Sequence, residues 1–307
     1  MTSNPTIIRF GGYQPPASVH TRGAQAFGEH LSRRLGAAVR FELTGNVIDL
    51  GRPARDLLAM VETGELDLCY FSASYLAERV PEMALLDLPF TFSDRAEVYG
   101  ILDGPLGGYL ADRLEAATGY RLLGFWDNGF RHFSNSVRPI RQPEDCRGLR
   151  IRTLFSDAHQ EVFRVLGFDP VALDVKDLLA GIEDGTVVAQ ENPLTNILNF
   201  DIHLKHRYIT LSGHFFGAAA LLCNAESLER WPEMVRTAVL DSAAAATAEQ
   251  RRLAGAEDDE ILKLLNKADV EIVELGTAER QRFADAVQPL IEAQRARFGD
   301  ALFRHLA

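Results

Sequence analysis

The chain has 307 residues, of which 47% are hydrophobic and 24% are charged, as is ordinary for a globular protein. A single core stops growing at roughly 250–300 residues, so this length favours two lobes. The formal net charge of −11 argues against binding to nucleic acid or to an anionic membrane surface, because both need a basic footprint. It does not exclude a small anionic ligand, because one or two buried arginines set the potential of a cleft.

Cysteine usage and hydropathy further limit the class of protein that this sequence can encode. Cys69, Cys146 and Cys223 are odd in number and far apart, which predicts buried free thiols rather than disulfides or a metal site. No apolar run approaches the roughly 20 residues of a membrane span. The first residues, MTSNPTIIRF, lack the features of a signal peptide. We therefore expect either a cytoplasmic protein or an exported one whose signal was removed.

The predicted elements alternate between β-rich and helical runs along almost the whole chain. Strands are expected at 7–10, 39–43, 66–71, 122–126, 149–152, 187–189, 208–211, 218–223 and 270–275. Helices are expected at 19–35 with Ser18 as N-cap, and at 53–62, 95–102, 106–117, 156–166, 175–183, 227 to about 267, and 277–298. This order is typical of largely parallel sheets flanked by helices, and the helix from 227 is long enough to cross both lobes.

Two arginines follow predicted strands, where ligands of open α/β sheets usually bind. Arg131 lies in WDNGFRHFSN, and Arg152 ends the run RIR. A guanidinium stays protonated and offers two parallel hydrogen bonds to a carboxylate. Strand alternation places Arg150 and Arg152 on one face and Ile151 on the other, so one of the two arginines is open to a surface role. A solvated or structural ion pair is the alternative for each.

The segment QEN supplies a further polar group at a strand-to-helix turn. Asn192 precedes a proline, so its amide either caps the following helix or faces the cleft and bonds a ligand oxygen. Glu191 could act as a general base, but nothing nearby in sequence supplies a nucleophile. The sequence also lacks GxSxG, HExxH, Walker and GxGxxG motifs.

Histidines and aromatic residues complete the candidates. His203 and His206 could share a helix face, but no third ligand stands at a recognised spacing, so we expect no metal and no cofactor. His214, in SGHFFG, is either a hydrogen-bonding group of the cleft or a satisfied core histidine. Ser72 follows a predicted strand, and several aromatic residues near strand ends are either core or the apolar wall of a ligand pocket; these are Tyr13, Phe71, Trp126 and Phe215.

Taken together, these motifs resemble the substrate-binding subunits of tripartite ATP-independent periplasmic (TRAP) transporters of the DctP type. The resemblance covers nearly the whole length and is strongest in four segments, which are 63–92, DGPLG at 103–107, 129–153 and QENPLTN at 190–196. It implies that Arg152 makes the main salt bridge to a ligand carboxylate, that Arg131 and Asn192 support that carboxylate, and that His214 faces the pocket.

The resemblance also implies the architecture. We expect the two-lobed α/β periplasmic-binding fold (class II-like), with mainly parallel sheets, flanking helices and a long helix spanning both lobes. Residues 1–126 and 214–253 are expected to form lobe I, residues 127–213 and 254–307 to form lobe II, and the ligand cleft to lie between them.

The function expected on these grounds is capture of a small organic carboxylate by hinge closure and its delivery to the membrane subunits of a TRAP permease. The protein is then periplasmic and monomeric, and it is not an enzyme. An aromatic or other apolar monocarboxylate is slightly favoured over a sugar acid. The alternatives are an enzyme acting on an organic acid with Glu191 or His214 as base, and a cytoplasmic ligand-sensing module.

Overall fold

A computed structural model describes residues 4–306. The chain divides into two compact units, each built from three separate segments. Unit 1 comprises residues 1–72, 109–127 and 218–256, and unit 2 comprises residues 73–108, 128–217 and 257–307. The chain therefore passes between the units five times, and long elements such as strand β4 (Tyr120–Asn135), strand β8 (Tyr208–Asn224) and helix α9 (Glu233–Leu265) contribute residues to both.

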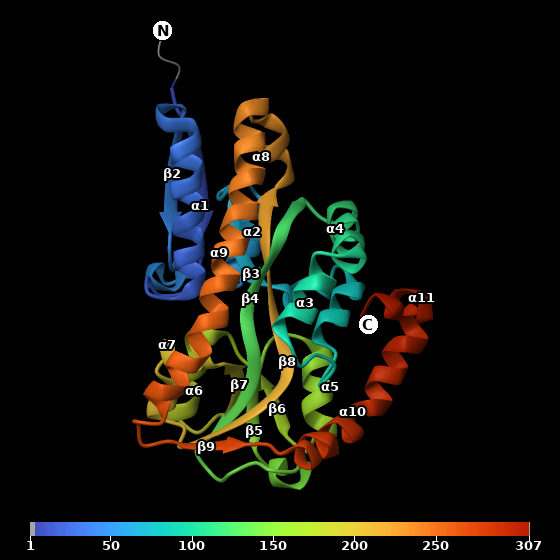
Figure 1. Cartoon of the computed structure of the whole chain (residues 1–307). Helices are drawn as coiled ribbons and strands as arrows, with labels where there is room; N and C mark the ends of the chain where they lie inside the picture. The colour runs from blue at the N-terminus through green and yellow to red at the C-terminus, as the bar shows by residue number, and fades with distance from the viewer. Residues whose placement is uncertain (1–3, 307) are drawn as a thin grey trace. The chain divides into compact units, whose positions relative to one another are not determined.

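Unit 1 is built on a mixed sheet. Strand β1 (Thr6–Gly11) runs parallel to both β2 (Val39–Thr44) and β3 (Leu68–Ser72), and β3 pairs antiparallel with the end of β8. Helix α1 (Val19–Leu35) lies along β2, as Figure 1 shows. It begins at Ser18, whose hydroxyl accepts a hydrogen bond from the amide of Thr21 at 3.1 Å, so the predicted cap is confirmed. The remaining short helices of this unit are α2 (Asp56–Glu62) and α8 (Ala225–Arg230).

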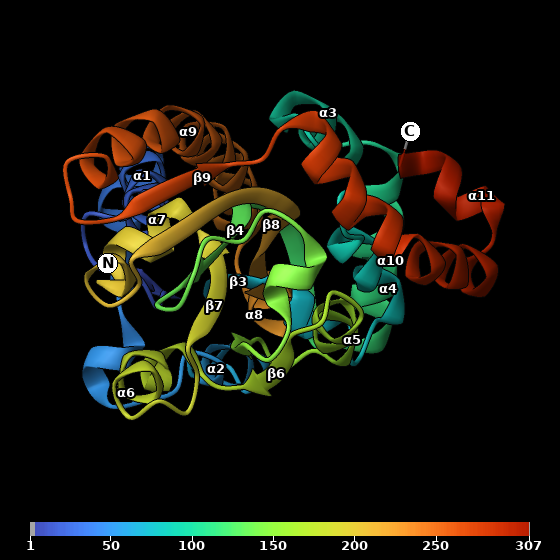
Figure 2. The same ribbon diagram turned by 90° about the horizontal axis from the view of Figure 1, so that it is seen from below.

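Unit 2 carries the second group of strands. Strand β5 (Arg150–Thr153) lies parallel between β6 (Asp169–Ala172) and β7 (Ala189–Pro193), and β7 pairs antiparallel with the end of β4. Figure 2 shows β9 (Glu271–Glu274) running beside the start of β8, to which it is parallel. The helices are α3 (Arg95–Leu102), α5 (Asp157–Val165), α6 (Leu178–Glu183), α7 (Leu194–Asn199), α10 (Thr277–Phe298) and α11 (Asp300–Phe303). Helix α4 (Pro105–Ala117) begins in unit 2 and continues in unit 1.

Short 3-10 helices join many of these elements. They are η1 (Gly36–Ala38), η2 (Val47–Leu50), η3 (Ala73–Leu76), η4 (Pro81–Asp87), η5 (Pro143–Cys146), η6 (Val175–Asp177), η7 (Ile202–Leu204) and η8 (Arg304–Leu306).

Each unit has its own apolar core. In unit 1 the Trp126 indole stacks on Tyr70 and Phe10, with ring centroids 5.3 and 6.2 Å apart. In unit 2 the ring of Phe133 packs against Phe163 and Phe283. Among residues 4–306, no helix combines the length and the apolar composition that crossing a bilayer requires.

Several predicted boundaries change in the structure. The strands expected at 208–211 and 218–223 are one continuous strand, β8, and β4 runs on through WDNGFRHFSN instead of ending at Trp126. The long helix expected from 227 is interrupted, because Pro232 has no amide to donate inside a helix, so that α8 and α9 are separate. Strand β6 was not predicted. The Val175–Glu183 helix begins as η6 and continues as α6.

The division into units differs from the expected lobes mainly at one segment. Residues 73–108 were assigned to lobe I together with the rest of 1–126, but they belong to unit 2. The reason is packing onto helix α5: the Asp87 carboxylate in η4 lies 3.2 Å from Nε2 of the buried His159, and it accepts a hydrogen bond from Ser74 at 2.9 Å. The outermost residues of the expected lobes, 1–3 and 307, lie outside the described residues.

Candidate functional site

Arg152 lies in the middle of the unit 2 strands, opposite Val171 of β6 and Gln190 of β7. Its side chain is almost fully buried, with 1% of the residue exposed. The Nε atom donates a hydrogen bond to the backbone carbonyl of Leu173 at 2.8 Å. Within residues 4–306, the two terminal Nη groups have no hydrogen-bond acceptor. Arg152 therefore has a fixed orientation and two free donor groups.

Arg150, two residues earlier on the same strand, has the surface role that one of the two arginines was open to. Arg150 is exposed, and its guanidinium donates to the backbone carbonyls of Thr186 and Gly185. The two arginines of RIR are thus distinguished by burial, which the strand period could not decide.

Arg131 forms a buried ion pair with Glu191. The pair joins β4 to β7: Nε and Nη2 of Arg131 both donate to the Glu191 carboxylate, and Nη2 also donates to the backbone carbonyl of Glu191 at 2.9 Å. Burial alone would raise the pKa of Glu191, but Arg131 and His214 outweigh it and hold that pKa below its usual range. A carboxylate held ionised in this way is a weak base, so the alternative role of Glu191 in proton abstraction has no support from its surroundings.

Asn192 belongs to a chain of buried amides instead of capping a helix. Pro193, not Asn192, occupies the N-cap of α7. The Asn192 side chain donates to Gln190 Oε1, while its Oδ1 accepts from Asn196 at 3.1 Å and from Arg131 at 3.3 Å. The alternative of a helix cap is therefore wrong, and the amide lies directly beside the Arg131–Glu191 pair.

His214 is fully buried on the other side of Glu191. Its Nδ1 lies 2.7 Å from the Ser212 hydroxyl, its Nε2 lies 3.4 Å from the Glu191 carboxylate, and its ring stacks on Phe133 at 4.3 Å. Burial lowers the pKa of His214 to about 4, so the imidazole is neutral at pH 7. In this structure its ring nitrogens are occupied by protein groups, which agrees with a satisfied core histidine.

The other histidines considered as metal ligands have protein partners. Nδ1 of His206 lies 2.9 Å from the Ser134 hydroxyl, and Nδ1 of His203 lies 3.3 Å from the Ile197 carbonyl. No group of three or more His, Cys, Asp or Glu side chains suited to a metal ion occurs in the described part of the chain.

The predicted aromatic wall is divided between the two units. Phe215 is in unit 2, where it is 1% exposed and stacks on His159 at 4.5 Å. Trp126 is in unit 1, is fully buried, and donates from Nε1 to the Thr247 hydroxyl at 3.1 Å. Both are core residues of their own units.

Tyr13, Phe71 and Ser72 also belong to unit 1: Tyr13 follows β1, and Phe71 and Ser72 are the last two residues of β3. The ring of Tyr13 packs edge-on against Phe71 at 5.2 Å, and the Tyr13 amide donates to the Tyr70 hydroxyl oxygen at 3.2 Å. The three residues are 6%, 2% and 7% exposed. The search for residues near strand ends, where ligands of α/β sheets usually bind, thus identified a compact cluster of polar and aromatic side chains in unit 1.

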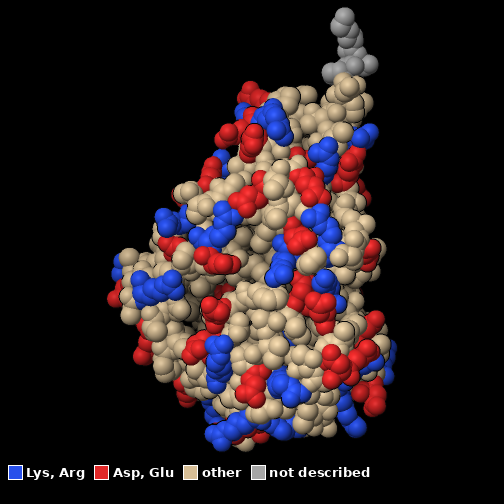
Figure 3. All heavy atoms as spheres, turned by 180° about the vertical axis from the view of Figure 1, so that it is seen from behind, with Lys and Arg blue, Asp and Glu red and all other residues tan. Residues whose placement is uncertain are grey.

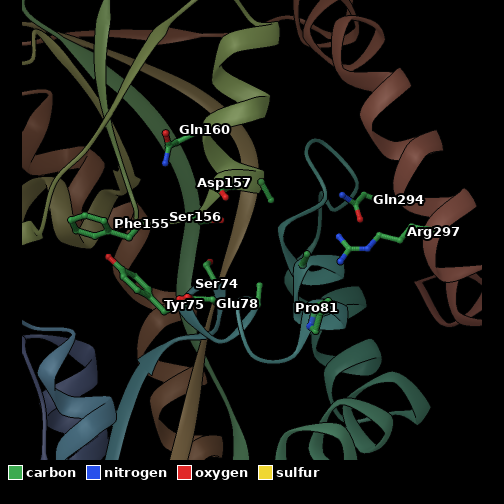
Figure 4. A pocket seen from close by; sticks show the side chains of 13 residues that line it. Ser74, Tyr75, Glu78, Pro81, Phe155, Ser156, Asp157, Gln160, Gln294 and Arg297 are labelled. Atoms are coloured by element: carbon green, nitrogen blue, oxygen red, sulfur yellow. The ribbon is translucent and has the colours of Figure 1, made fainter. Parts of the chain in front are cut away.

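Unit 2 also contains a pocket of about 400 Å³ that the sequence did not indicate. Figure 4 shows its lining: η3 and the loop after it contribute Tyr75 and Glu78, the start of α5 contributes Ser156 and Asp157, and α10 contributes Gln294 and Arg297. Tyr75 and Phe155 lie close together at one end, away from Gln294 and Arg297. Phe155 comes two residues after β5 and Tyr75 three residues after β3. Both therefore lie near strand ends, like the candidates that the sequence suggested.

The charge of Arg152 influences the pKa of Tyr75. Burial raises the pKa of Tyr75, and the charges of Arg152 and then Asp174 are the next largest influences on that pKa. Asp174, 5% exposed, directly follows the residue whose carbonyl holds Arg152. Sequence reasoning missed it because the strand β6 that precedes it was not predicted.

On the face of the molecule drawn in Figure 3, charges of both signs are mixed. Figure 3 shows Lys and Arg interspersed with Asp and Glu over one face of the molecule. The net charge of −11 is therefore not gathered into a single acidic patch on that face.

Comparison with known proteins gives a consistent family. A model of bacterial extracellular solute-binding proteins, family 7 (DctP), matches residues 10–297. An uncharacterised protein, y4mM, from Sinorhizobium fredii is 31% identical over 96% of this chain, which spans about half (53%) of that relative's length. The 2,3-diketo-L-gulonate-binding periplasmic protein of Escherichia coli is 28% identical, over 91% of this chain and 84% of its own.

Solved structures agree with this likeness. The sugar-acid-binding protein of Advenella mimigardefordensis, crystallised in complex with galactonate, superposes with a TM-score of 0.93 at 28% identity, over 99% of this chain and 97% of its own. This similarity confirms the predicted two-lobed α/β fold class.

Proposed function

Because the chain belongs to family 7 of the bacterial extracellular solute-binding proteins, we propose that it captures a small organic carboxylate in the periplasm and presents it to a TRAP membrane permease. Proteins of this family and its structural neighbours are solute-binding proteins rather than enzymes. The observation that carries the proposal is the buried guanidinium of Arg152, whose Nη groups have no acceptor among residues 4–306.

Chemistry supports a carboxylate as the missing partner. Buried charges are normally paired and hydrogen-bonded, since leaving one unpaired is expensive. A carboxylate has two oxygens at the spacing of two parallel N–H groups, and such charge-assisted bonds are about twice as strong as neutral ones. The Leu173 carbonyl holds Nε, so the guanidinium is oriented before the ligand arrives.

The Arg131–Glu191 pair gives Arg152 a polar but electrically balanced neighbourhood. Arg131 is already neutralised by Glu191, and His214 is uncharged. Arg152 is proposed to make the principal ion pair with the ligand carboxylate. The supporting residues around that carboxylate are proposed to be Arg131, Asn192 and His214.

The class of acid is the finer part of the proposal. An apolar monocarboxylate was slightly favoured from aromatic residues near strand ends, but Trp126 and Phe215 are packed inside the cores of their own units. Two similar proteins are named with hydroxylated or oxidised sugar acids, galactonate and 2,3-diketo-L-gulonate, and a 26% identical relative from Rhodobacter capsulatus is named as binding C4-dicarboxylates. We therefore propose a hydroxylated or otherwise polar organic acid, captured by hinge closure, with the protein acting as a monomer.

A thermal-shift screen against organic acids tests this proposal. An acid present at 100 times its dissociation constant stabilises the native state by about 2.7 kcal/mol, which raises the melting temperature measurably. We expect stabilising acids to lose their effect in Arg152→Met, where the apolar side chain has no donor. The matched control is Arg150→Met on the same strand, which is exposed and should respond like the parent.

Two results would contradict the proposal. One is an acid that stabilises Arg152→Met as much as the parent protein, provided that circular dichroism shows both to be folded. The other is a complete screen in which no carboxylate raises the melting temperature of the parent.

A further inference from the structure

A buried arginine and a buried aspartate lie at the ends of neighbouring parallel strands of unit 2 without forming an ion pair. Arg152 is in β5, and Asp174 comes just after β6, in which Val171 is opposite Arg152. The Leu173 carbonyl that accepts from Arg152 Nε immediately precedes Asp174. The two residues are 1% and 5% exposed.

Each of the two groups has unused hydrogen-bonding capacity. Asp174 Oδ1 accepts from the amide of Lys176 at 3.1 Å and so caps η6. Its Oδ2 accepts no hydrogen bond from any residue in the range 4–306, and in that range no acceptor meets the Nη groups of Arg152. Buried opposite charges on neighbouring strands usually pair, because isolated buried charges are strongly unfavourable. Here they are held apart, one as acceptor and the other as donor.

The buried charges around Arg152 and Asp174 balance. Arg131 is paired with Glu191, and Arg152 is opposed by Asp174, so that the buried groups include two cations and two anions. The charges of Arg152 and Asp174 influence the pKa of Tyr75 more strongly than those of the Arg131–Glu191 pair do. An acid without a donor group would satisfy Arg152, but it would leave Oδ2 of Asp174 without a partner and add an unbalanced negative charge.

We infer, resting on the proposed function, that Asp174 selects among the acids that Arg152 binds: the ligand carries a hydrogen-bond donor, a hydroxyl or an ammonium group, close to its carboxyl carbon. The carboxylate accepts from the Nη groups of Arg152, and the neighbouring donor gives its hydrogen to Asp174 Oδ2. An ammonium group also restores electrical balance, while a hydroxyl supplies the hydrogen bond alone. Asp174 is thus a specificity-determining residue for this site.

The test uses matched trios of acids that differ only at the carbon next to the carboxylate. Propionate, lactate and alanine form one trio; phenylacetate, mandelate and phenylglycine form the other. Dissociation constants are measured by calorimetry for the parent and for Asp174→Ser. Serine also caps helices well, but its side chain has one uncharged oxygen, which the cap engages, so the second, charged oxygen that would accept from the ligand is lost.

We expect a donor-bearing member of at least one trio to bind the parent about 10- to 100-fold more tightly than its donor-free partner, as hydrogen bonds to charged groups suggest. In Asp174→Ser this preference should fall to about 3-fold or less. Tighter binding of lactate or mandelate would assign a hydroxyl, and tighter binding of alanine or phenylglycine an ammonium group. Asp94→Ser is the control, because Asp94 caps α3 in the same manner on an exposed surface, and it should leave the preference unchanged.

Three outcomes would overturn the inference. The donor-free acids could bind as tightly as their partners, or Asp174→Ser could weaken every member of a trio equally, as a purely structural role predicts. The third outcome is that no member of either trio binds, although other acids of the screen stabilise the parent and not Arg152→Met. In that case the inference falls and the proposed function stands. Absence of stabilisation by any acid would instead remove the proposed function.

Discussion

The interiors of the two units use different chemistry around their buried polar groups. In unit 1, beside β1 and β3, the interior is aromatic: Trp126 stacks on Phe10 and on Tyr70, and the rings of Phe10 and Tyr70 pack at a tilt. In unit 2, the strands β5 and β7 bury full charges, with Arg152 and Glu191 at most 1% exposed. Aromatic packing needs no counter-ion, whereas buried charge requires one. The contrast teaches that unit 2 holds the group that needs an external partner, which is Arg152.

Breaking the buried pair of unit 2 should have the largest effect on stability. Glu191→Leu leaves the Arg131 guanidinium buried without its carboxylate, and removing one partner of such a pair lowers the free energy of unfolding by about 3–5 kcal/mol. Urea denaturation measures this loss. The double change Arg131→Met with Glu191→Leu removes both charges and should recover much of the stability. A Glu191→Leu protein as stable as the parent would show that the pair is not a structural requirement.

Acidification should also act mainly on unit 2. Burial lowers the pKa of His132 to about 3 and those of His206 and His214 to about 4, while in unit 1 only His20 among the described histidines is similarly lowered, to about 3. The unfolded chain protonates these imidazoles near pH 6.5, so it binds more protons than the folded chain below that pH. Stability is therefore full above about pH 6.5 and falls as the pH drops toward 4, by up to about 1.4 kcal/mol per pH unit for each histidine.

The measurement is the free energy of unfolding in urea at pH 7 and pH 5, together with hydrogen exchange. Amides of unit 2 should lose protection first, because unit 2 contains three of these four histidines. Equal stability at both pH values, or earlier loss of protection in unit 1, would contradict the assignment of neutral buried imidazoles.

The smallest change is expected in the aromatic interior of unit 1. Tyr70→Phe removes the hydroxyl oxygen that accepts from the Tyr13 amide, but it keeps the ring that stacks on Trp126. A lost neutral hydrogen bond lowers the free energy of unfolding by about 1 kcal/mol. Urea denaturation would detect this, and affinity for the acid should change little. A loss comparable to that of Glu191→Leu would remove the contrast between the two interiors.

Local sequence signals were sufficient for many elements. Helices α1, α3 and α10 have the predicted bounds, because a cap such as Ser18 or Asp94 and a following glycine or Asp-Gly-Pro turn act within a few residues. Such signals do not report pairing at a distance. Gly129 and Gly213 look like turn residues, yet both lie inside the long strands β4 and β8, where partner strands stabilise a left-handed backbone.

The sequence by itself determined that a strand ending in RIR carries a candidate carboxylate ligand within a two-lobed α/β chain, because strand period and element order are local properties. Only the tertiary structure decided that Arg150 is exposed and Arg152 buried, that Arg131 meets Glu191 from 60 residues away, and that Asp174 lies beside Arg152. Burial and ion pairing depend on which strands become neighbours, and that choice is made by the packing of the whole chain.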